Sequence, residues 1–337
     1  MKTAIVILNW NGIGYLKMFL NTIIRFSTSP DTKVYVADNG STDGSADWVA
    51  ENFKEVKVIR FDRNYGFAGG YNKAIEKLEA EYIVLINSDI EVAEGWLQPL
   101  VDYMEENRDT AACQPKILSF DRKDYFEHAG AAGGFIDLYG YPFCRGRIFN
   151  ITEKDEGQYD DQVDIFWSSG ACMMVRADAW KKCGGFDPDF FAHMEEIDLC
   201  WRFNKAGFRV VFIPGATVRH IGGGSLAYDS PYKIYLNFRN SLFMLYKNLP
   251  DNRLFSVLLI RRILDGVAAV MFLVKGRFSY FRAVLKAHTS YYKCIGELRR
   301  KRDLLKKSGE DQIPGLILNK SLVFEFYIKG IKTYNRL

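Results

Sequence analysis

The residues with the clearest potential for chemistry are Asn87, Ser88 and Asp89, a polar triplet that directly follows the apolar run Tyr82–Ile86. This run predicts a strand that is buried on both faces, as in a parallel sheet. Because ligands of such sheets bind at the carboxyl ends of the strands, Asp89 stands where a metal- or phosphate-binding group would lie. A turn that leads into a helix uses the same residue types, and the triplet alone favours that simpler interpretation.

Two further loops carry groups suited to a nucleotide. Asp38 follows the predicted strand Lys33–Ala37 and can accept a hydrogen bond from a base or a ribose, although a turn before Asn-Gly would use the same residue. Gly66–Gly70 lets the backbone approach a ligand closely, and Asn72 adds a polar side chain. The segment has no Gly-Lys-Ser/Thr, which excludes a phosphate-binding P-loop.

The second half of the body offers a histidine and two glutamates. Asp89 and His220 are candidate ligands for Mn²⁺ or Mg²⁺, with a diphosphate completing the shell. A lone histidine is more often a packing residue, but glycines follow His220 where the chain must turn tightly. Glu195 and Glu196 begin a predicted helix, Met194–Lys205, where the helix dipole favours acidic residues. Their functional interpretation is that one of them is a general base.

The elements that must position these groups alternate regularly at the start of the chain. Buried strands are predicted at Ala4–Leu8, Lys33–Ala37, Val56–Phe61 and Tyr82–Ile86, with polar loops and helices between them. This alternation predicts a doubly wound, mostly parallel α/β sheet with its loops gathered at one edge. Residues 121–161 are rich in glycine and aromatic residues and predict a long, irregular functional loop.

The composition divides the chain into an acidic body and a basic tail. The chain has 337 residues, of which 48% are hydrophobic, enough for one large domain and an appendage. Residues 247–337 carry a net charge of +12 and residues 1–246 a net charge of −8. We therefore predict a catalytic domain over residues 1–246 and a helical extension over residues 247–337. Because the positive charge lies outside the body, nucleic-acid binding is a poor fit.

The tail suggests contact with a membrane. Leu254–Val274 is strongly apolar, but Arg261, Arg262 and Asp265 interrupt it, so it is not expected to span a bilayer, which takes about 20 apolar residues. With its neighbouring basic residues it suits an amphipathic region on an anionic membrane surface. The alternative is a helical cap that packs on the body and exposes a solvated basic face. Scattered cysteines and the lack of a signal peptide predict a cytoplasmic protein at the inner face of the membrane.

Taken in order, the motifs resemble the inverting glycosyltransferases of family two, and within them the rhamnosyltransferase-like branch that builds bacterial surface polysaccharides. The likeness covers residues 3 to about 245 and rests on the segments Ile7–Asn11, Asp38–Ser45, Asn64–Asn72, Asn87–Asp89, Ser169–Ala171, Gly184–Asp187 and Glu195–Leu199. The resemblance implies a GT-A fold with a C-terminal helical extension, a nucleotide-sugar donor and a divalent cation, Mn²⁺ or Mg²⁺.

The same resemblance implies roles for individual residues. Asp38 matches the acidic residue that holds the nucleoside, Asp89 and His220 match metal ligands, and Glu196 matches the catalytic base. Many relatives have Glu-Asp where this chain has Glu195-Glu196, and Asn87 replaces the first acid of an Asp-X-Asp motif. Further expected contacts to the nucleotide are Asn9, Asn64, Gly66, Gly70, Asn72 and Ser88. The expected donor and acceptor pocket consists of Trp167, Ser168, Ser169 and Gly170.

The implied reaction is a single displacement at the anomeric carbon, with inversion of configuration. The expected donor is dTDP-rhamnose or a UDP-hexose, and the expected acceptor is a glycan or a lipid-linked glycan. One alternative is an inactive GT-A-like scaffold protein at the membrane. Another is a nucleotidyltransferase, which would need a glycine-rich, Lys/Arg-bearing loop after the first strand, where this chain has Asn9-Trp10-Asn11-Gly12.

Overall fold

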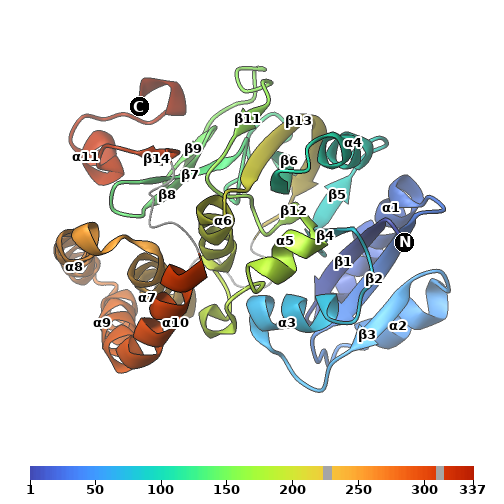
Figure 1. Cartoon of the computed structure of the whole chain (residues 1–337), viewed down its shortest axis with the longest axis horizontal. Helices are drawn as coiled ribbons and strands as arrows, with labels where there is room; N and C mark the ends of the chain where they lie inside the picture. The colour runs from blue at the N-terminus through green and yellow to red at the C-terminus, as the bar shows by residue number, and fades with distance from the viewer. Residues whose placement is uncertain (223–229, 309–314) are drawn as a thin grey trace.

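The computed structural model describes residues 1–222, 230–308 and 315–337 (Figure 1). Its centre is a nine-stranded mixed sheet. The strands are β1 (Thr3–Asn9), β2 (Thr32–Asp38), β3 (Lys57–Arg60), β4 (Tyr82–Asn87), β5 (Ile90–Val92), β6 (Thr110–Ser119), β11 (Val163–Asp164), β12 (Cys172–Arg176) and β13 (Arg209–His220). They lie in the order β11-β13-β6-β12-β4-β1-β2-β3, and β5 pairs with β13.

The strands near the N-terminus run parallel, as predicted. β1 pairs in parallel with both β2 and β4, and β2 pairs in parallel with β3. β12 is antiparallel to β4 and β6, whereas β13 runs parallel to β6. Within β1, Ile5 and Ile7 belong to one buried cluster and Val6 to the cluster on the other face. Because both faces are covered, these strands read as continuous apolar runs.

Helices cover both faces of the sheet (Figure 1). Side chains of α1 (Ile13–Ser27), α2 (Ser45–Asn52) and α4 (Gln98–Glu106) fill one buried cluster. Side chains of α3 (Gly66–Ile75), α5 (Ala177–Lys182) and α6 (Glu195–Lys205) fill the cluster on the opposite face. The predicted α/β architecture is therefore confirmed.

A second sheet of five short strands corrects one prediction. It consists of β7 (Gly134–Asp137), β8 (Pro142–Cys144), β9 (Arg147–Ile148), β10 (Ile151–Thr152) and β14 (Ile317–Leu318). The prediction that residues 121–161 are irregular is wrong, because β7 to β10 lie within them. Strands of two to four residues are too short to show an alternating pattern. They are stabilised instead by ring contacts such as Phe135 on Phe143, whose centroids are 5.9 Å apart.

The C-terminal region is helical, as expected. It contains α7 (Pro231–Asn248), α8 (Asp251–Val274), α9 (Phe278–Lys293), α10 (Ile295–Ser308) and α11 (Leu322–Tyr327). Helix α7 runs across residue 246, and β14 pairs with β7 of the body. Within the described ranges, no helix is long and apolar enough to cross a membrane.

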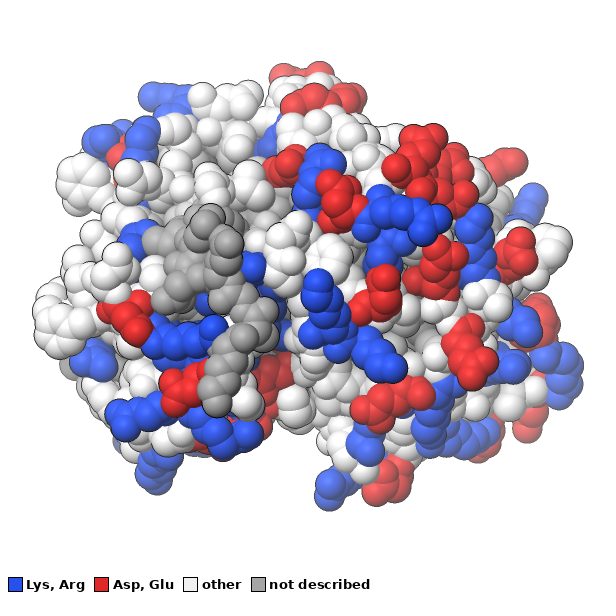
Figure 2. All heavy atoms as spheres, viewed as in Figure 1, with Lys and Arg blue, Asp and Glu red and all other residues white. Residues whose placement is uncertain are grey.

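The charged side chains are distributed unevenly over the face drawn in Figure 2. Acidic and basic side chains are interspersed over the part that contains β1 to β3, α1 and α4. The opposite margin, where α8 and α11 lie, has more uncharged surface, with basic and some acidic side chains.

Candidate active site

The carboxyl ends of three parallel strands meet at one edge of the sheet. In the strand register Asn9 lies opposite Asp38, and Leu8 lies opposite Asn87. The Nδ2 atom of Asn9 donates hydrogen bonds to Asp38 Oδ1 at 3.1 Å and to Ser45 Oγ at 2.8 Å. Asn9 therefore joins the ends of β1 and β2 and fixes the loop that follows β2.

A cavity of about 630 Å³ opens beside this edge. A pocket of this size is in the range of small-molecule sites. The predicted site residues that line it are Asn64, Gly66, Ser88, Asp89, Trp167, Ser169, Gly170, Glu195, Glu196 and His220. Residues from both halves of the body thus converge on one pocket, although they are up to 156 positions apart in sequence.

The pocket lining does not include five of the predicted site residues, which are Asn9, Asp38, Gly70, Asn72 and Ser168. Asn9 and Asp38 are buried and bond to each other. The side-chain amide of Asn72 forms two hydrogen bonds to the backbone of Phe186. Nδ2 donates to the carbonyl oxygen at 2.7 Å, and Oδ1 accepts from the N–H group at 3.0 Å. A Cβ atom on Gly70 would lie 2.8 Å from Leu8 Cδ1, so this glycine allows α3 to pack on β1. Ser168 is fully buried.

Gly66 does reach the pocket, and its conformation explains the residue type. Its φ is +73°, a left-handed value that favours glycine. A Cβ atom there would lie 2.6 Å from the carbonyl oxygen of Phe191. That oxygen accepts hydrogen bonds from the first turn of α3, from the backbone N–H groups of Phe67 at 2.6 Å and Ala68 at 3.1 Å. Gly66 therefore lets the two loops that frame the pocket meet.

The candidate metal ligands are neighbours because β5 pairs with β13. His220 ends β13 opposite Ile90, the residue after Asp89. Nε2 of His220 lies 3.2 Å from Asp89 Oδ1, and Nδ1 lies 3.2 Å from Glu127 Oε2. Burial disfavours the imidazolium, but Asp89 and Glu127 outweigh this and raise the pKa of His220 to about 10. Glu127 had no signal in the sequence, because it belongs to no motif and lies far from His220 along the chain.

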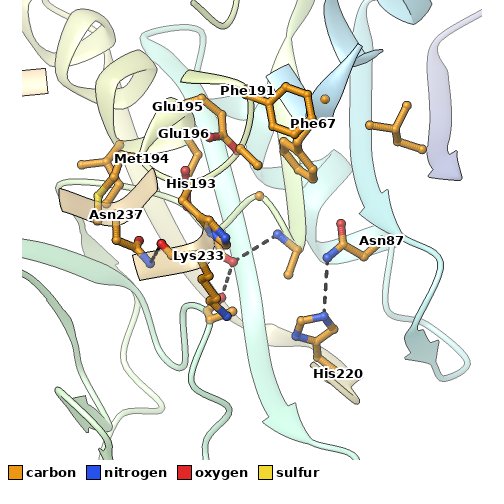
Figure 3. Close-up of a pocket in the computed structure, with 18 of the residues that line it drawn as sticks. Phe67, Asn87, Phe191, His193, Met194, Glu195, Glu196, His220, Lys233 and Asn237 are labelled. Carbon is orange, nitrogen blue, oxygen red and sulfur yellow. Dashed lines mark hydrogen bonds between the residues drawn. The ribbon is translucent and has the colours of Figure 1, made fainter. Parts of the chain in front are cut away.

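The two glutamates enter the pocket from the first turn of α6. Figure 3 shows Glu195 and Glu196 on one side of the pocket and Asn87 with His220 on the other. Burial raises the pKa of Glu196 to about 7. Burial and the neighbouring charge of Glu196 raise the pKa of Glu195 well above its usual range. Among the described residues, Oε2 of each glutamate has no hydrogen-bond partner. A half-buried carboxyl with such a pKa can exchange a proton near neutral pH.

The loop before these glutamates is strained and held from behind. Phe191, His193 and Met194 have φ values of 64°, 70° and 72°, which are unfavourable for residues with a side chain. Nδ2 of Asn240, on α7, donates to the carbonyl oxygens of Phe190 at 2.9 Å, Ala192 at 2.9 Å and His193 at 2.7 Å. Asn240 therefore stabilises the backbone that presents Glu195 and Glu196.

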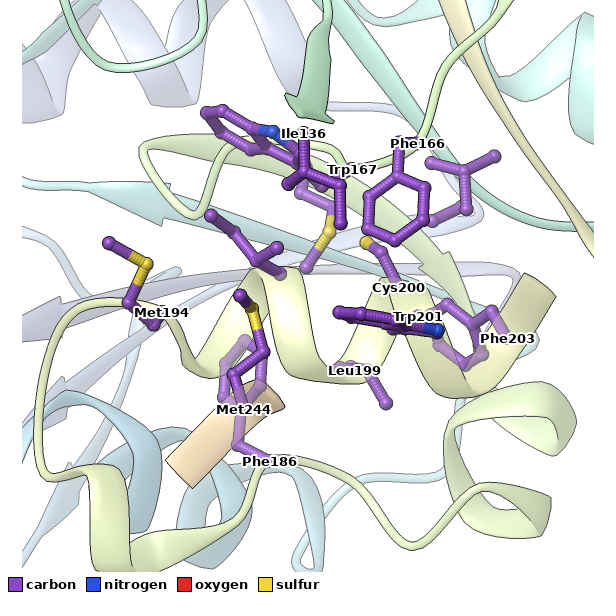
Figure 4. Close-up of a cluster of buried hydrophobic side chains, with 14 of the residues drawn as sticks. Ile136, Phe166, Trp167, Phe186, Met194, Leu199, Cys200, Trp201, Phe203 and Met244 are labelled. Carbon is purple, nitrogen blue, oxygen red and sulfur yellow. The ribbon is translucent and has the colours of Figure 1, made fainter. Parts of the chain in front are cut away.

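Helix α6 itself is anchored by aromatic packing (Figure 4). Leu199, Trp201 and Phe203 are almost completely buried, and the ring of Trp201 meets that of Phe166 edge-on with centroids 5.3 Å apart. Asp198 is buried and accepts hydrogen bonds from Lys247 and Asn248 on α7. A carboxyl carried on such a helix has little freedom to move away from the pocket.

Basic side chains also line the pocket, and the sequence did not single them out. They are His128, Arg147, His193 and Lys233. Burial, together with the charge of Arg147, lowers the pKa of His128 to about 3. Burial, together with the charge of Lys233, lowers the pKa of His193 to about 3. Each of these residues is isolated in sequence, so only the fold brings them together.

Comparison with known proteins agrees with this architecture. The sheet, its helices and the strand-end pocket define a GT-A fold, and solved structures share it. GalNAc-T7 with UDP, GalNAc and Mn²⁺ aligns with a TM-score of 0.58 and 16% identity over 74% of this chain and 48% of that chain. The mannosyltransferase PcManGT from Pyrobaculum calidifontis, in complex with GDP-Man and Mn²⁺, aligns with a TM-score of 0.53 and 12% identity over 86% and 87%. This chain spans about half the length of GalNAc-T7.

The chain belongs to glycosyl transferase family 2, because the sequence profile of that family matches residues 4–184. It is 27% identical over 221 residues to the N-acetylglucosaminyl-diphospho-decaprenol L-rhamnosyltransferase of Mycobacterium tuberculosis, covering 61% of this chain and 71% of the relative. It is also 27% identical to the rhamnosyltransferase WbbL of Escherichia coli over 48% of this chain and 61% of that protein. The predicted family and its rhamnosyltransferase-like branch are confirmed.

Proposed function

We propose that the chain is an inverting glycosyltransferase of cell-surface polysaccharide synthesis, which moves a sugar from a nucleotide diphosphate to a hydroxyl of a glycan or lipid-linked glycan. The observation that supports this proposal is the arrangement of two pairs of ionisable residues around one pocket. His220 lies on one side of the pocket, with Asp89 Oδ1 at 3.2 Å from its Nε2, and Glu195 and Glu196 lie on the other side. The first suits a cation that holds a diphosphate, and the second suits a base.

The residues at the first site fit a divalent cation. Neighbouring ligands around an octahedral ion with bonds of about 2.1 Å lie about 3 Å apart. Asp89 Oδ1 and His220 Nε2 are 3.2 Å apart, and both residues line the pocket. No cluster of three or more His, Cys, Asp or Glu that could hold a metal occurs in the described ranges, so the diphosphate or water would supply further ligands. The cation, Mn²⁺ or Mg²⁺, would neutralise charge on the departing diphosphate.

Glu196 is our candidate for the base. Its carboxylate takes the proton from an acceptor hydroxyl, and the acceptor oxygen forms a bond to the anomeric carbon as the bond from that carbon to the diphosphate breaks. A single displacement of this kind inverts the anomeric configuration. Glu195, which is 3% exposed, is less accessible to an acceptor than the half-buried Glu196.

We propose dTDP-rhamnose or a UDP-hexose as the donor. The relatives named above include two rhamnosyltransferases, and one of them has an N-acetylglucosaminyl-diphospho-decaprenol acceptor in its name. A lipid-linked glycan is accordingly our candidate acceptor. Asp38, the expected nucleoside contact, would need to exchange its bond to Asn9 for one to the nucleotide, whereas Asn64 and Ser88 already face the pocket.

The alternative is an inactive scaffold protein with this fold. The Oε2 atoms of Glu195 and Glu196 are buried and find no hydrogen-bond partner among the residues that the structure describes, which lowers the stability of the fold. A scaffold would have no reason to retain them. This unfavourable arrangement supports turnover over scaffolding.

Calorimetric titration with dTDP, UDP and GDP, with and without Mn²⁺, tests the proposed site. We expect one nucleotide to bind in a Mn²⁺-dependent manner, and Asp89→Ala to weaken that binding by more than about tenfold. Asp102→Ala, at an exposed position on α4, is the matched control and should bind normally. If the protein binds none of the three nucleotides, the transferase proposal fails and the scaffold interpretation replaces it.

A further inference from the structure

Helix α8 buries two charged residues in its middle and exposes large apolar side chains. Arg261 and Asp265 are 3% and 0% exposed. Arg261 Nε donates to Asp265 Oδ1 at 2.9 Å, and His288 Nε2 lies 3.1 Å from Asp265 Oδ2. The guanidinium of Arg261 also lies 3.9 Å from the ring centre of Tyr141 in the body. Two of the three charges that interrupt the apolar run are thus partnered within the protein. The third, Arg262, is half-buried, with its guanidinium 5.3 Å from the ring centre of Tyr292.

The outer face of α8 is an apolar stripe. We define it by its exposed large side chains, which are Phe255, Leu259, Ile263, Val267, Val270, Met271, Leu273 and Val274. Most of them follow one another at steps of three or four residues, which places them on one side of a helix. From residue 255 to residue 274 the exposed positions carry no charge, and only Ser256 and Gly266 interrupt the apolar side chains.

The stripe is too large to be an ordinary part of a water-exposed surface. Helix α8 has 24 residues, which makes it about 36 Å long. Phe255 is 77% exposed and Val274 is 81% exposed, so the ends of the stripe are as open as its middle. Contiguous apolar patches of this extent mark sites of protein or membrane contact.

The surroundings of the stripe are basic. Lys275 and Arg277 follow its C-terminal end, and Arg282, Lys286 and Lys293 are exposed on α9. Between residues 252 and 296 the sequence contains a single acidic residue, the buried Asp265. The margin of the molecule over α8 in Figure 2 is mostly white, with blue and some red side chains. An apolar face with a basic rim complements anionic lipid.

We propose that α8 docks on an anionic membrane surface, with its apolar stripe in the boundary between headgroups and acyl chains and its basic rim against the headgroups. A second copy of the chain is a poorer partner, because pairing through this face would bring two basic rims together. The inference rests on the proposed function for its purpose, since docking would hold the pocket beside a lipid-linked acceptor. The binding itself requires no turnover and can be tested alone.

The test is cosedimentation of the full chain with vesicles of phosphatidylcholine, with and without phosphatidylglycerol. We expect binding to the anionic vesicles only, and weaker binding as salt is raised. Phe255→Glu combined with Ile263→Glu should reduce the bound fraction by about tenfold or more, because both side chains would lie in the boundary. Lys275→Gln and Arg277→Gln should each weaken binding by about fivefold.

Met18→Glu is the matched control, because Met18 is 56% exposed on α1, at the other side of the molecule from α8. It should bind vesicles as the wild type does. The wild type failing to bind anionic vesicles, or the double variant binding them equally well, would overturn the proposal. So would light scattering that shows a dimer dissociated by Phe255→Glu and Ile263→Glu without any vesicle binding, which would assign the stripe to a second copy.

Nucleotide titration separates this inference from the proposed function. The stripe variants should bind nucleotide as the wild type does, since α8 contributes no residue to the pocket lining. Asp89→Ala should still bind vesicles. Loss of both properties in a stripe variant would indicate misfolding, which the thermal unfolding profile would reveal, and the single variant Val274→Glu would then replace the double variant in the vesicle assay.

Discussion

Helix α6 and the segment before it carry two pairs of acidic residues, and the protein environment shifts the pKa values of the two pairs in opposite directions. Asp187 and Asp198 are paired: Lys247 Nζ lies 2.6 Å from Asp187 Oδ2 and 2.9 Å from Asp198 Oδ2. Burial raises the pKa values of both carboxyls, but Lys247, together with Lys301 at Asp187 and Arg202 at Asp198, outweighs burial and holds both pKa values below their usual range. Glu195 and Glu196 lie at the pocket, and burial raises their pKa values.

The contrast separates structural charge from reactive charge within a few residues. A carboxylate that only holds helices together is stabilised by cations, because an uncompensated buried charge is costly. A carboxylate that must accept a proton near neutral pH cannot be paired with a cation, because the pairing would lower its pKa too far. Cations of the fold stabilise the carboxylates of Asp187 and Asp198, whereas burial destabilises the ionised forms of Glu195 and Glu196.

Glu196→Gln should have the largest effect of these substitutions. It should reduce activity without reducing stability. The amide cannot take a proton, so we expect turnover to fall by about 100- to 10,000-fold. Stability should stay the same or increase, because the substitution removes a carboxyl whose Oε2 is buried and has no hydrogen-bond partner in the described part of the chain. Steady-state kinetics and thermal unfolding check the two halves of this statement, with the exposed Glu106→Gln as control. Substantial turnover in Glu196→Gln would remove this residue from the role of base.

Lys247→Met should have the opposite profile. It removes the cation that two buried carboxylates share, while Lys301 still faces Asp187 and Arg202 still faces Asp198. Breaking a buried pair costs about 3–5 kcal/mol of unfolding free energy, and we expect a loss near the lower end of that range because these two cations remain. Urea denaturation measures this loss, and Lys33→Met, at an exposed position of β2, is the matched control. A loss below about 1 kcal/mol would mean that the Asp187 and Asp198 cluster is not the structural counterpart of the glutamate pair.

Asn240→Ala should affect both properties moderately. It removes three hydrogen bonds to the strained backbone before α6, and we expect a loss of about 1–3 kcal/mol in unfolding free energy. Because that backbone presents Glu196, kcat should fall by about tenfold, a value within the effect of misplacing a catalytic group. Nucleotide affinity should not change, since Asn240 is not part of the pocket lining. Asn52→Ala removes a hydrogen bond to a helix carbonyl far from the pocket and serves as control. A uniform loss of affinity and rate would indicate general unfolding.

The sequence predicted those site residues that lie at the ends of strands. Asp89, at the end of a strand that reads as a buried apolar run, lines the pocket, as the rule for parallel sheets requires. Asn72 shows where that reasoning stops. It stands in a glycine-rich motif, but two turns of α3 separate it from Gly66, and its amide faces the backbone of Phe186. Which side of a short helix faces a pocket depends on packing that the motif does not encode.

Glu127, Lys233 and Asn240 mark the other limit. Each is a single polar residue outside any motif, and each reaches the site region through long-range topology. Asn240 acts on a loop about 50 positions earlier in the chain, because α7 packs beside α6. Similarly, the predicted amphipathic tail did not show that Arg261 and Asp265 point inward, since periodicity alone does not say which face of a helix is covered.

The pH dependence of kcat/KM should show the smallest effect, but it should distinguish most clearly between Glu195 and Glu196. A base must be deprotonated, and burial raises the pKa of Glu196 to about 7, so kcat/KM should rise with pH until about 7. Glu195→Gln should leave this limb in place and the plateau active, because burial and not the charge of Glu195 raises the pKa of Glu196. A complete loss of activity in Glu195→Gln would instead make Glu195 the base.

Stability should respond with opposite signs in the two acid pairs. The raised pKa of Glu196 gives a contribution to stability that is complete below the usual pKa of glutamate and is lost as pH rises through about 7. The lowered pKa values of Asp187 and Asp198 give a contribution that is present above the usual pKa of aspartate and is lost as pH falls below it. Glu196→Gln should therefore flatten the neutral side of the stability profile, and Lys247→Met the acidic side. Urea midpoints across pH test this, and a neutral limb unchanged by Glu196→Gln would show that its carboxyl is not held protonated by burial.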